Sequence, residues 1–386
     1  MRTIYCDYNS TTATDPRVIE AMNAALAVGG ANPSSAHSLG RRARVILDEA
    51  RQNIASLIGA KASEIILTGG GSEADNLAIL GSLYSADAHG KHCVTVATEH
   101  HAVLASVEWA KRNGFDVTVL PVDGQGHVDM GRFQDSLRPD TQIVSVMLAN
   151  NEVGTLHPIS ELAAIARDRG IWFHTDAVQA YGKVPVHVAQ LGVDMLSLAA
   201  HKFYGPKGVG VLYARGGIRL APVVHGGGQE LGRRAGTENI AGAAGTARAM
   251  SLCADDPGEV PRIKGVTDDF RRRLAAQVGD IQIFGDPRNS LPNTVGVGFA
   301  GVDGGTLMMA LDLRGICVST GSACATGASH PSHVLEAMGI DRRYLGGTIR
   351  FSFGRGSLPE DAAVIADAVA EEVVRLRAMT PAAAHH

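Results

Sequence analysis

The sequence contains few cysteines, and their spacing argues against the sites that cysteines most often build. Five are present among 386 residues, at positions 6, 93, 253, 317 and 324, and no two of them form a C-x-x-C pair. Because the number is odd and the residues are spread along the chain, neither a disulfide framework nor a structural zinc site is indicated. This cysteine usage fits a reducing compartment, and we expect a cytoplasmic protein.

Long uncharged apolar runs are also missing, so we expect no segment that spans a bilayer. The opening residues, MRTIYCDYNSTTATDP, lack the apolar core and the small-residue cleavage pattern of a secretion signal. The formal net charge is only −4, which gives no electrostatic reason to expect nucleic acid or a membrane surface as a partner. Hydrophobic residues make up 45% of the chain and charged residues 19%, a balance typical of soluble enzymes.

Lysine is scarce as well. The 35 basic residues comprise 28 arginines and seven lysines, so this sequence uses arginine where only a positive charge is needed. Each remaining lysine therefore becomes a candidate for a role that requires its amine.

Short apolar runs alternate with helical patterns from about residue 15 to 250, which is typical of an α/β domain built on a mostly parallel, buried sheet. Helices are predicted over stretches such as 101–113 and 160–169. Strands are predicted over 64–68, 92–97, 116–122, 141–149, 171–177, 194–200 and 208–214.

A second, smaller α+β domain is predicted after the sequence DDPGEVP, at about residues 255–260. Its pattern is a charged helix over 262–278, strands at TVGVGFA, GICVST and TIRFSFG, and a last helix over 359–378. We predict a large domain over 15–256 and a small domain over 1–14 and 257–380. Residues 381–386 are predicted to be a disordered tail.

The stretch TGGGSEADN (68–76) places three glycines between a strand and a helix, with Ser72 as the expected N-cap. Free backbone N–H groups and the positive end of a helix form an anion site at such a turn. The spacing matches neither a Walker A loop nor a dinucleotide-binding fingerprint. A simple turn with a capped helix explains the same residues equally well.

Two further polar residues follow predicted strands. In IWFHTDAVQ, Asp176 ends a strand and Gln179 lies one turn later, where the acid can meet a ligand cation or cap the next helix. In LSLAAHKFYGPKG, Lys202 directly follows a buried strand, beside His201. Partial desolvation there lowers the pKa of a lysine and favours a Schiff base, although a strand-end lysine can also reach solvent.

These three sites together match one cofactor. Pyridoxal 5'-phosphate requires a phosphate site, an acid against its pyridine nitrogen and a Schiff-base lysine. Each feature is ambiguous alone, but the ordered set of TGGGS, Asp176 and Lys202 predicts this cofactor.

The sequence resembles the cysteine desulfurases of the NifS/IscS type, in the class V aminotransferase family. The resemblance runs over nearly the whole chain, through DYNSTTATDP, NPSSAHSLGRRA, LTGGGSEADN, TEHHA, ANNEVGT, FHTDAVQ, HKFYGPKGVG, GGGQELGRRAGTEN, STGSACATG and TIRFSFGR. It implies the fold of aspartate aminotransferase (fold type I of the pyridoxal-phosphate enzymes) and a homodimer with sites near the subunit interface. It also implies L-cysteine as substrate and a sulfur-acceptor protein, such as an iron–sulfur scaffold, as partner.

The resemblance assigns a role to each matching residue. Lys202 binds the cofactor covalently, and Asp176 keeps the pyridine nitrogen protonated. Gln179 and Asn151 hydrogen-bond near the ring oxygen and the substrate. The residues expected at the phosphate are Gly71, Ser72 and His201, joined by Thr237 from the partner subunit.

Two roles implied by the resemblance concern the substrate and proton transfer. Arg350 binds the substrate carboxylate as a fork, although an arginine in a strand pattern is more often an ion-pair partner. His100 stacks on the ring and helps to move protons, although a surface histidine beside His101 is the simpler interpretation of the local sequence.

Cys324 lies in a loop over 319–332 in which no large apolar residue is present. A segment that buries no apolar surface stays mobile. Cys6, Cys93, Cys253 and Cys317 lie in apolar patterns and are expected to be inert. The resemblance implies that the Cys324 thiolate attacks the substrate sulfur and carries it away as a persulfide. We expect Cys324 to meet metal only transiently, at sulfur hand-over, without a stable metal site.

One departure from the family pattern affects the cofactor. Before His201 the family usually has Ser-Gly, whereas this chain has Ala199 and Ala200. Because the serine contacts the phosphate in the family, we expect weaker cofactor retention here.

Two classes of alternative function remain open at this point. The first is another fold-type-I enzyme, such as an aminotransferase, a kynureninase-like or selenocysteine lyase, or an epimerase; a nucleophilic Cys324 disfavours it. The second is a non-catalytic sulfur-carrier platform, which the presence of both Lys202 and Asp176 disfavours.

Overall fold

A seven-stranded sheet forms the centre of the larger part of the molecule, with strand order β2-β8-β7-β6-β5-β3-β4. The computed structural model describes residues 2–28, 30–320 and 331–379. The strands are β2 (Ile65–Thr68), β3 (His92–Val96), β4 (Asp116–Leu120), β5 (Thr141–Ser145), β6 (Trp172–Asp176), β7 (Met195–Ala199) and β8 (Gly210–Ala214). Only β8 runs antiparallel to its neighbours, so the predicted mixed, mostly parallel sheet is confirmed.

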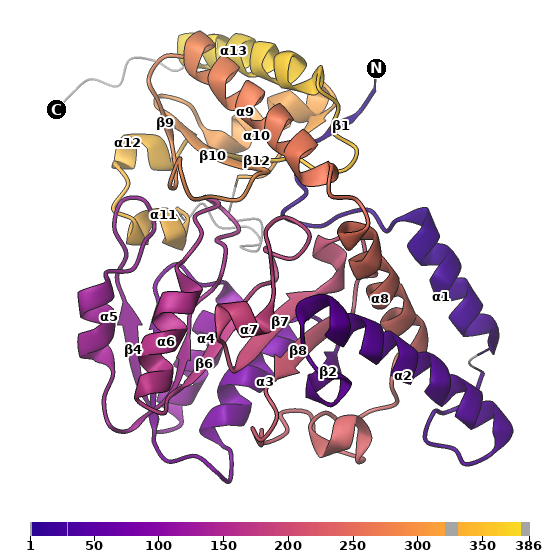
Figure 1. Cartoon of the computed structure of the whole chain (residues 1–386). Coiled ribbons are helices and arrows are strands. Elements are labelled where there is room, and N and C mark those ends of the chain that lie inside the picture. Colours follow the sequence, from indigo (N-terminus) through magenta and orange to yellow (C-terminus); the bar gives the residue numbers. More distant parts are fainter. Residues whose placement is uncertain (1, 29, 321–330, 380–386) are drawn as a thin grey trace.

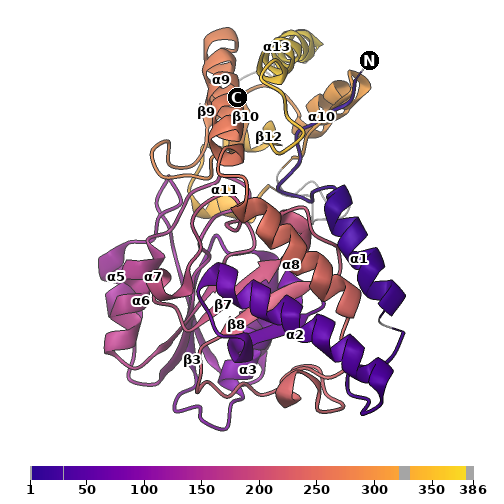
Figure 2. The same ribbon diagram turned by 45° about the vertical axis from the view of Figure 1, so that its right-hand side comes forward.

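Helices cover both faces of this sheet, as a parallel sheet with apolar strands requires (Figure 1). Helices α1 (Pro16–Val28), α2 (Ser38–Ile58) and α8 (Ile240–Ala254) lie side by side on one flank (Figure 2). The other main helices are α3 (Gly71–Leu83), α4 (His101–Arg112), α5 (Met130–Ser136), α6 (Ile159–Asp168) and α7 (Val188–Leu191). Helix α3 is buried along most of its length, because it crosses the sheet beneath α4.

The start of α3 differs from the prediction. The N-cap residue is Gly70, and Ser72 lies inside the first turn, so the prediction of Ser72 as the cap is wrong. The Gly69 N–H, just before the helix, donates to the Glu73 carboxylate at 2.8 Å. The hydrogen bond of this backbone donor is therefore made by a side chain of the first turn and not by a serine cap. The helix therefore begins earlier and brings the Ser72 hydroxyl onto its first turn.

The smaller part of the molecule is an α+β layer above the large sheet (Figure 1). Its antiparallel sheet has the order β12-β10-β9, formed by β9 (Ile281–Ile283), β10 (Thr294–Phe299) and β12 (Thr348–Ser352). It is covered by α9 (Glu259–Gln277), α10 (Gly304–Leu313) and α13 (Asp361–Met379), and two short helices, α11 (His333–Ala337) and α12 (Arg342–Leu345), complete it. Phe270, Phe351 and Phe353 stack in its core.

The N-terminal segment joins the two parts. Strand β1 (Ile4–Tyr5) pairs in parallel with β11 (Ile316–Cys317) in the smaller part. A few residues later, Thr12 N–H donates to the carbonyl of His201 at 2.9 Å, at the edge of the large sheet. Residues 7–11 therefore run between the two sheets, and domain boundaries at 14/15 and 256/257 stay a prediction.

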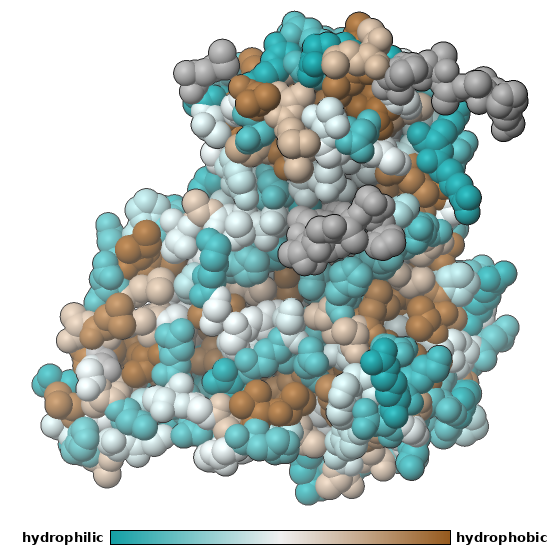
Figure 3. Space-filling view, turned by 180° about the vertical axis from the view of Figure 1, so that it is seen from behind, coloured by the Kyte–Doolittle hydropathy of each residue, from teal (hydrophilic) through white to brown (hydrophobic). Residues whose placement is uncertain are grey.

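The surface mixes hydrophilic and hydrophobic side chains, and the smaller part forms a narrower lobe above the broader large part (Figure 3). Among the described residues, no helix combines the length and the apolar character needed to cross a membrane.

Candidate active site

A cavity of about 310 Å³ lies where the strands of the large sheet end and the N-terminal segment crosses them. Carboxyl ends of parallel strands meet at one edge of a sheet, and ligands of open α/β folds bind there. The cavity is lined by Asn9, Ser10, Gly71, Ser72, Asp75, His100, Met147, Asn151, Asp176, Val178, Gln179, Ala199, His201, Lys202 and Arg350.

Most of the residues predicted from the sequence meet in this cavity. It brings together Gly71, Ser72, His100, Asn151, Asp176, Gln179, His201, Lys202 and Arg350, from both sheets. Thr237 is exposed and lies outside this lining. Both properties are expected of a residue that completes the site of a second subunit. Cys324 lies outside the described residues, so its role stays a prediction.

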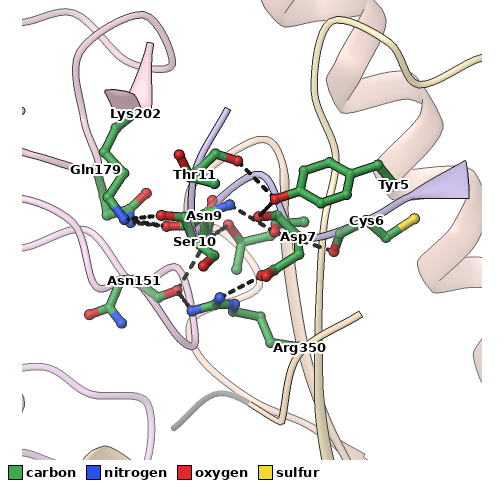
Figure 4. A network of polar contacts seen from close by, with 12 residues as sticks. Tyr5, Cys6, Asp7, Asn9, Ser10, Thr11, Asn151, Gln179, Lys202 and Arg350 are labelled. Carbon is green, nitrogen blue, oxygen red and sulfur yellow. Dashed lines mark hydrogen bonds and ion pairs between the residues drawn. The ribbon is translucent and has the colours of Figure 1, made fainter. Parts of the chain in front are cut away.

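Lys202 lies on the 3-10 helix η2 (Ala200–Lys202), which directly follows β7. Its Nζ donates to the backbone carbonyls of Asn9 and Ser10, each at 2.7 Å (Figure 4). The amine is therefore held in the cavity wall by the N-terminal segment, and the alternative of a lysine that extends into solvent is wrong. Two carbonyl acceptors also suit an amine that binds a proton and later gives it up.

Asp176 is the buried last residue of β6, on the strand beside the one that leads to Lys202. One carboxylate oxygen accepts the Val178 N–H at 2.8 Å, but turns follow and the next helix begins only at Val188, so the alternative of a helix cap is wrong. Burial raises the pKa of Asp176 to about 6, while the Val178 N–H and Lys202 act in the opposite direction. A buried carboxyl of this kind pairs well with a protonated pyridine nitrogen, because the cation restores its ionised form.

His100 is the N-cap of α4, and its Nδ1 accepts the backbone N–H of Ala102 at 3.1 Å. A neutral imidazole carries one proton, so an accepting Nδ1 places that proton on Nε2. Burial, together with the cation Lys202 and the rings of His101 and His333, lowers the pKa of His100 to about 4. His100 lines the cavity, so the interpretation as a surface histidine is wrong.

Arg350 is 3% exposed and projects from β12 toward the cavity. Its Nη2 pairs with Asp7 at 2.8 Å and its Nη1 donates to the Asn151 carbonyl at 3.0 Å (Figure 4). Its Nε is buried and has no hydrogen-bond partner. The ion-pair interpretation is therefore correct, and the unpaired N–H also leaves a donor for an anionic ligand.

The turn before α3 provides a cradle that suits a phosphate. A Cβ on Gly71 would approach Val178 Cγ2 to 2.8 Å and Ala199 Cβ to 3.3 Å, so a side chain there would fill the space. The Ser72 hydroxyl and the His201 ring face the same cavity as the first turn of α3, whose N–H groups attract anions. Burial and the neighbouring lysines 202, 207 and 183 lower the pKa of His201 to about 4, so the ring is neutral and can donate one hydrogen bond.

Sequence reasoning assigned no role to the N-terminal residues that complete the site. Asn9 and Ser10 bind Lys202, and Asp7 binds Arg350. The run DYNST directly after the apolar stretch IYC (4–6) was the available signal, but nothing local indicates that it reaches the large sheet. Asp75 was also missed; its carboxyl is buried near Asp176, and burial raises its pKa well above the usual value.

The comparisons with known proteins agree with this geometry. Residues 4–364 match the family described as class-V aminotransferase. The cysteine desulfurase IscS of Dictyoglomus turgidum is 45% identical over 381 residues, which cover 98% of this chain and 97% of the relative. The chain belongs to the cysteine desulfurases of the class-V aminotransferase family.

Solved structures of similar proteins show the same fold. A NifS-like protein superposes with a TM-score of 0.90 at 35% identity and covers 97% of this chain and 100% of its own. SspA in complex with cysteine gives a TM-score of 0.82 at 34% identity, covering 92% of this chain and 100% of its own. The predicted fold type and the pyridoxal-phosphate dependence of this cysteine desulfurase are thereby confirmed.

Replacing Ala199 with serine is expected to strengthen cofactor retention in this cysteine desulfurase. Ala199 is 2% exposed and lines the cradle beside Gly71, where a hydroxyl would face the phosphate position. One added hydrogen bond should slow loss of cofactor about 2- to 10-fold. Cofactor absorbance during dialysis measures this, with Ala199→Val as the hydroxyl-free control. Equal retention in the serine variant and the parent would contradict the expectation.

Proposed function

We propose that the protein removes sulfur from L-cysteine, releases L-alanine and carries the sulfur as a persulfide on Cys324 to an acceptor protein. The observation that supports this most is the convergence of Lys202, Asp176 and Arg350 on one cavity, from η2, from the end of β6 and from β12. An amine, a buried acid and a buried guanidinium are the groups that an amino-acid substrate and its cofactor require.

We assign binding of the substrate to Arg350 and Asn151, which both line the cavity. Arg350 offers its unpaired Nε to the α-carboxylate, and its Nη groups are already held by Asp7 and Asn151. Because those contacts orient the guanidinium before the substrate arrives, little side-chain entropy is lost on binding. The Asn151 side chain, in the same wall, is proposed to contact the substrate.

The cofactor is proposed to be held by Lys202, Asp176, Gln179, Asn151, His100, His201 and the Gly71–Ser72 turn, with Thr237 from a second subunit. When bound, pyridoxal phosphate supplies an electron sink for the substrate α-carbon. Lys202 is then the base that takes the α-proton, and the Asn9 and Ser10 carbonyls accept hydrogen bonds from the resulting ammonium.

His100 is proposed to act as a hydrogen-bond donor. The Ala102 N–H occupies its Nδ1, and Nε2 already bears the proton, so neither ring nitrogen is free to accept another. An Nε2–H that points at sulfur stabilises a thiolate. In other enzymes, a neutral histidine at a helix N-terminus polarises the substrate in the same way. This differs from the proton carrier that the family resemblance suggested.

The sulfur transfer itself is proposed for Cys324, which lies outside the described residues. Its thiolate attacks the substrate sulfur; an S–S bond forms and the C–S bond breaks. The electron pair of the broken bond stays on carbon, which is protonated to give alanine. The persulfide then passes to an acceptor such as an iron–sulfur scaffold, with metal contact only during hand-over. In the part of the chain that the structure describes, no group of three metal-ligating side chains is found.

A homodimer is proposed on two observations. Thr237, assigned to a second copy's cofactor site, is exposed. Tyr84 and Trp109, 46% and 47% exposed, line an apolar hollow with Leu80 and Val223, which a second copy would cover. A cytoplasmic location stays a prediction from the cysteine usage.

The proposed reaction is tested with the pyridoxal-phosphate-loaded protein, L-cysteine and a thiol reductant. Alanine and sulfide should appear in equal amounts, and D-cysteine should give neither. Pyruvate and sulfide in place of alanine would favour a lyase. A keto acid that keeps the sulfur, formed only when a second keto acid accepts the amino group, would favour an aminotransferase. A protein that shows no visible cofactor absorbance would favour a non-catalytic platform.

The protonation state of His100 can be measured directly. In holoenzyme with ¹⁵N-labelled histidine, the His100 ring should show an unprotonated Nδ1 and a protonated Nε2 from about pH 6 to 8. The His100→Asn variant, which can still cap the helix, identifies the resonances. Protonation of both nitrogens at neutral pH would contradict the donor role.

A further inference from the structure

A second lysine contacts the residues that hold Lys202. Lys183 lies four residues after Gln179, and its Nζ donates to Gln179 Oε1 at 2.7 Å and to Asn9 Oδ1 at 3.5 Å. Gln179 Nε2 donates to the Asn9 carbonyl at 2.8 Å, and that carbonyl also accepts the Nζ of Lys202. Two amines and one side-chain amide therefore meet at the backbone and side chain of Asn9.

The surroundings of Lys183 do not neutralise its charge. Its two hydrogen-bond partners are amide oxygens, and among the described residues it makes no ion pair. The charged and titratable groups around it are Lys202, Arg350, Cys253, Glu259, Tyr8, Tyr181 and Tyr204. The only acid of this set, Glu259, pairs with Arg355 at 2.6 Å. Burial, together with the positive charges of Lys202 and Arg350, lowers the pKa of Lys183 to about 7.

A lysine in such a place is costly if it serves packing alone. Desolvation and like charges oppose it, and an apolar side chain of equal length would fill the same space without that cost. A titratable side chain that lies beside a cavity despite desolvation and despite nearby like charges is a candidate for a functional role.

Lys183 and the Asn9 carbonyl together determine which way the Gln179 amide points. An amide has a carbonyl oxygen that accepts and an NH₂ group that donates, whereas an ammonium only donates. The oxygen of Gln179 must therefore face Lys183, and its NH₂ group faces Asn9. One of the two N–H bonds is used by the Asn9 carbonyl, and the other remains for the cavity that Gln179 lines.

We propose that Lys183 is a positioning residue, which holds Gln179 with its NH₂ group toward the cavity so that it can donate a hydrogen bond to bound pyridoxal phosphate. This inference rests on the proposed function only for the identity of the bound cofactor. Without Lys183, the oxygen of Gln179 has no fixed donor, and the single hydrogen bond to the Asn9 carbonyl is left to hold the amide against rotation. Lys183 acts through Gln179 and does not itself contact the reacting atoms.

The test is a pH titration of the visible absorbance of the holoenzyme, which reports on hydrogen bonds to the cofactor. Lys183→Met keeps the length of the side chain and removes its donor. The midpoint of the titration should rise by about 0.5–1 pH unit, because a donor to the deprotonated form and a nearby like charge are both lost. Lys183→Arg retains charge and donors and should stay within about 0.2 unit of the parent. An unchanged midpoint in Lys183→Met would overturn the proposal.

Measurements in a Gln179→Ala protein separate the orientation of Gln179 from a direct effect of the Lys183 charge on the titration midpoint. In Gln179→Ala protein, Lys183→Met should shift the midpoint by less than half of its effect in the parent, because the amide that it orients is gone. A shift of equal size in both backgrounds would overturn the positioning role. If Lys183→Met folds poorly, as judged by circular dichroism, Gln179→Glu serves instead: it keeps an acceptor for Lys183, loses the NH₂ donor and should raise the midpoint.

These readouts do not depend on turnover. If the holoenzyme releases no sulfide from cysteine yet shows the predicted shifts, the proposed function fails and the role of Lys183 stands. If sulfide is released but the shifts are absent, only the role of Lys183 fails.

Discussion

Lys202→Ala protein is expected to release sulfide from L-cysteine at a rate lower by a factor on the order of 10³ or more. The amine that is removed is the one held by the Asn9 and Ser10 carbonyls beside Asp176, and no other described lysine amine takes its place. The amine of Lys183 is hydrogen-bonded to Gln179 Oε1 and to Asn9 Oδ1. Both covalent retention of cofactor and removal of the α-proton should therefore be lost together.

Three measurements check this expectation: sulfide release, exchange of the substrate α-proton with deuterated solvent, and the visible spectrum after gel filtration. Lys207→Ala is a matched control, because Lys207 is exposed in the turn that follows and does not line the cavity. The control should keep all three properties. If Lys202→Ala retains α-proton exchange at the parent rate, Lys202 is not the base.

Cys324→Ala protein is expected to lose sulfide and alanine formation, also by a factor on the order of 10³, but to keep the cofactor spectrum. Lys202, Asp176 and Arg350 are untouched in this variant, so substrate binding and α-proton exchange should continue near the parent rate. The two variants thus divide the reaction: Lys202→Ala stops it before proton removal, and Cys324→Ala stops it afterwards.

The other cysteines are poor substitutes for Cys324. Cys6 and Cys93 are fully buried, and burial raises the pKa of both thiols. Cys317, the nearest in sequence, is partly buried and points its thiol at Asp312 Oδ1, 3.8 Å away; burial and this carboxylate raise its pKa. Cys317→Ala is therefore the matched control and should keep full activity. Full sulfide release by Cys324→Ala would show that another nucleophile carries the sulfur.

Much of the site could be predicted because local sequence determines the positions of strand ends. Asp176 and Lys202 each follow an apolar run, and parallel strands place such residues at one edge of the sheet. The glycines of TGGGS mark a turn before a helix for the same kind of reason. The family resemblance then assigned roles to residues whose local patterns are ambiguous, above all His100 and Arg350.

The chemistry of single atoms at the site was not predictable from local patterns. The Asn9 carbonyl that binds Lys202 is 193 residues away from it in the chain, and Asp7 is 343 residues from Arg350. The proton position on His100 depends on whether its Nδ1 reaches the Ala102 N–H, and the orientation of Gln179 depends on Lys183. The predicted Ser72 cap was wrong because the Glu73 carboxylate satisfies Gly69 and the helix begins earlier.

The sequence by itself thus determined the fold class, the cofactor and most of the residues around the cavity, because apolar periodicity and turn residues act over a few positions. Only the tertiary structure decided which hydrogen bonds those residues make. It placed the N-terminal segment between the two sheets. This placement gives Lys202 its acceptors, Gln179 and Lys183 their shared partner Asn9, and Arg350 its ion-pair partner Asp7. Contacts between segments so far apart in the chain form only when the whole fold closes.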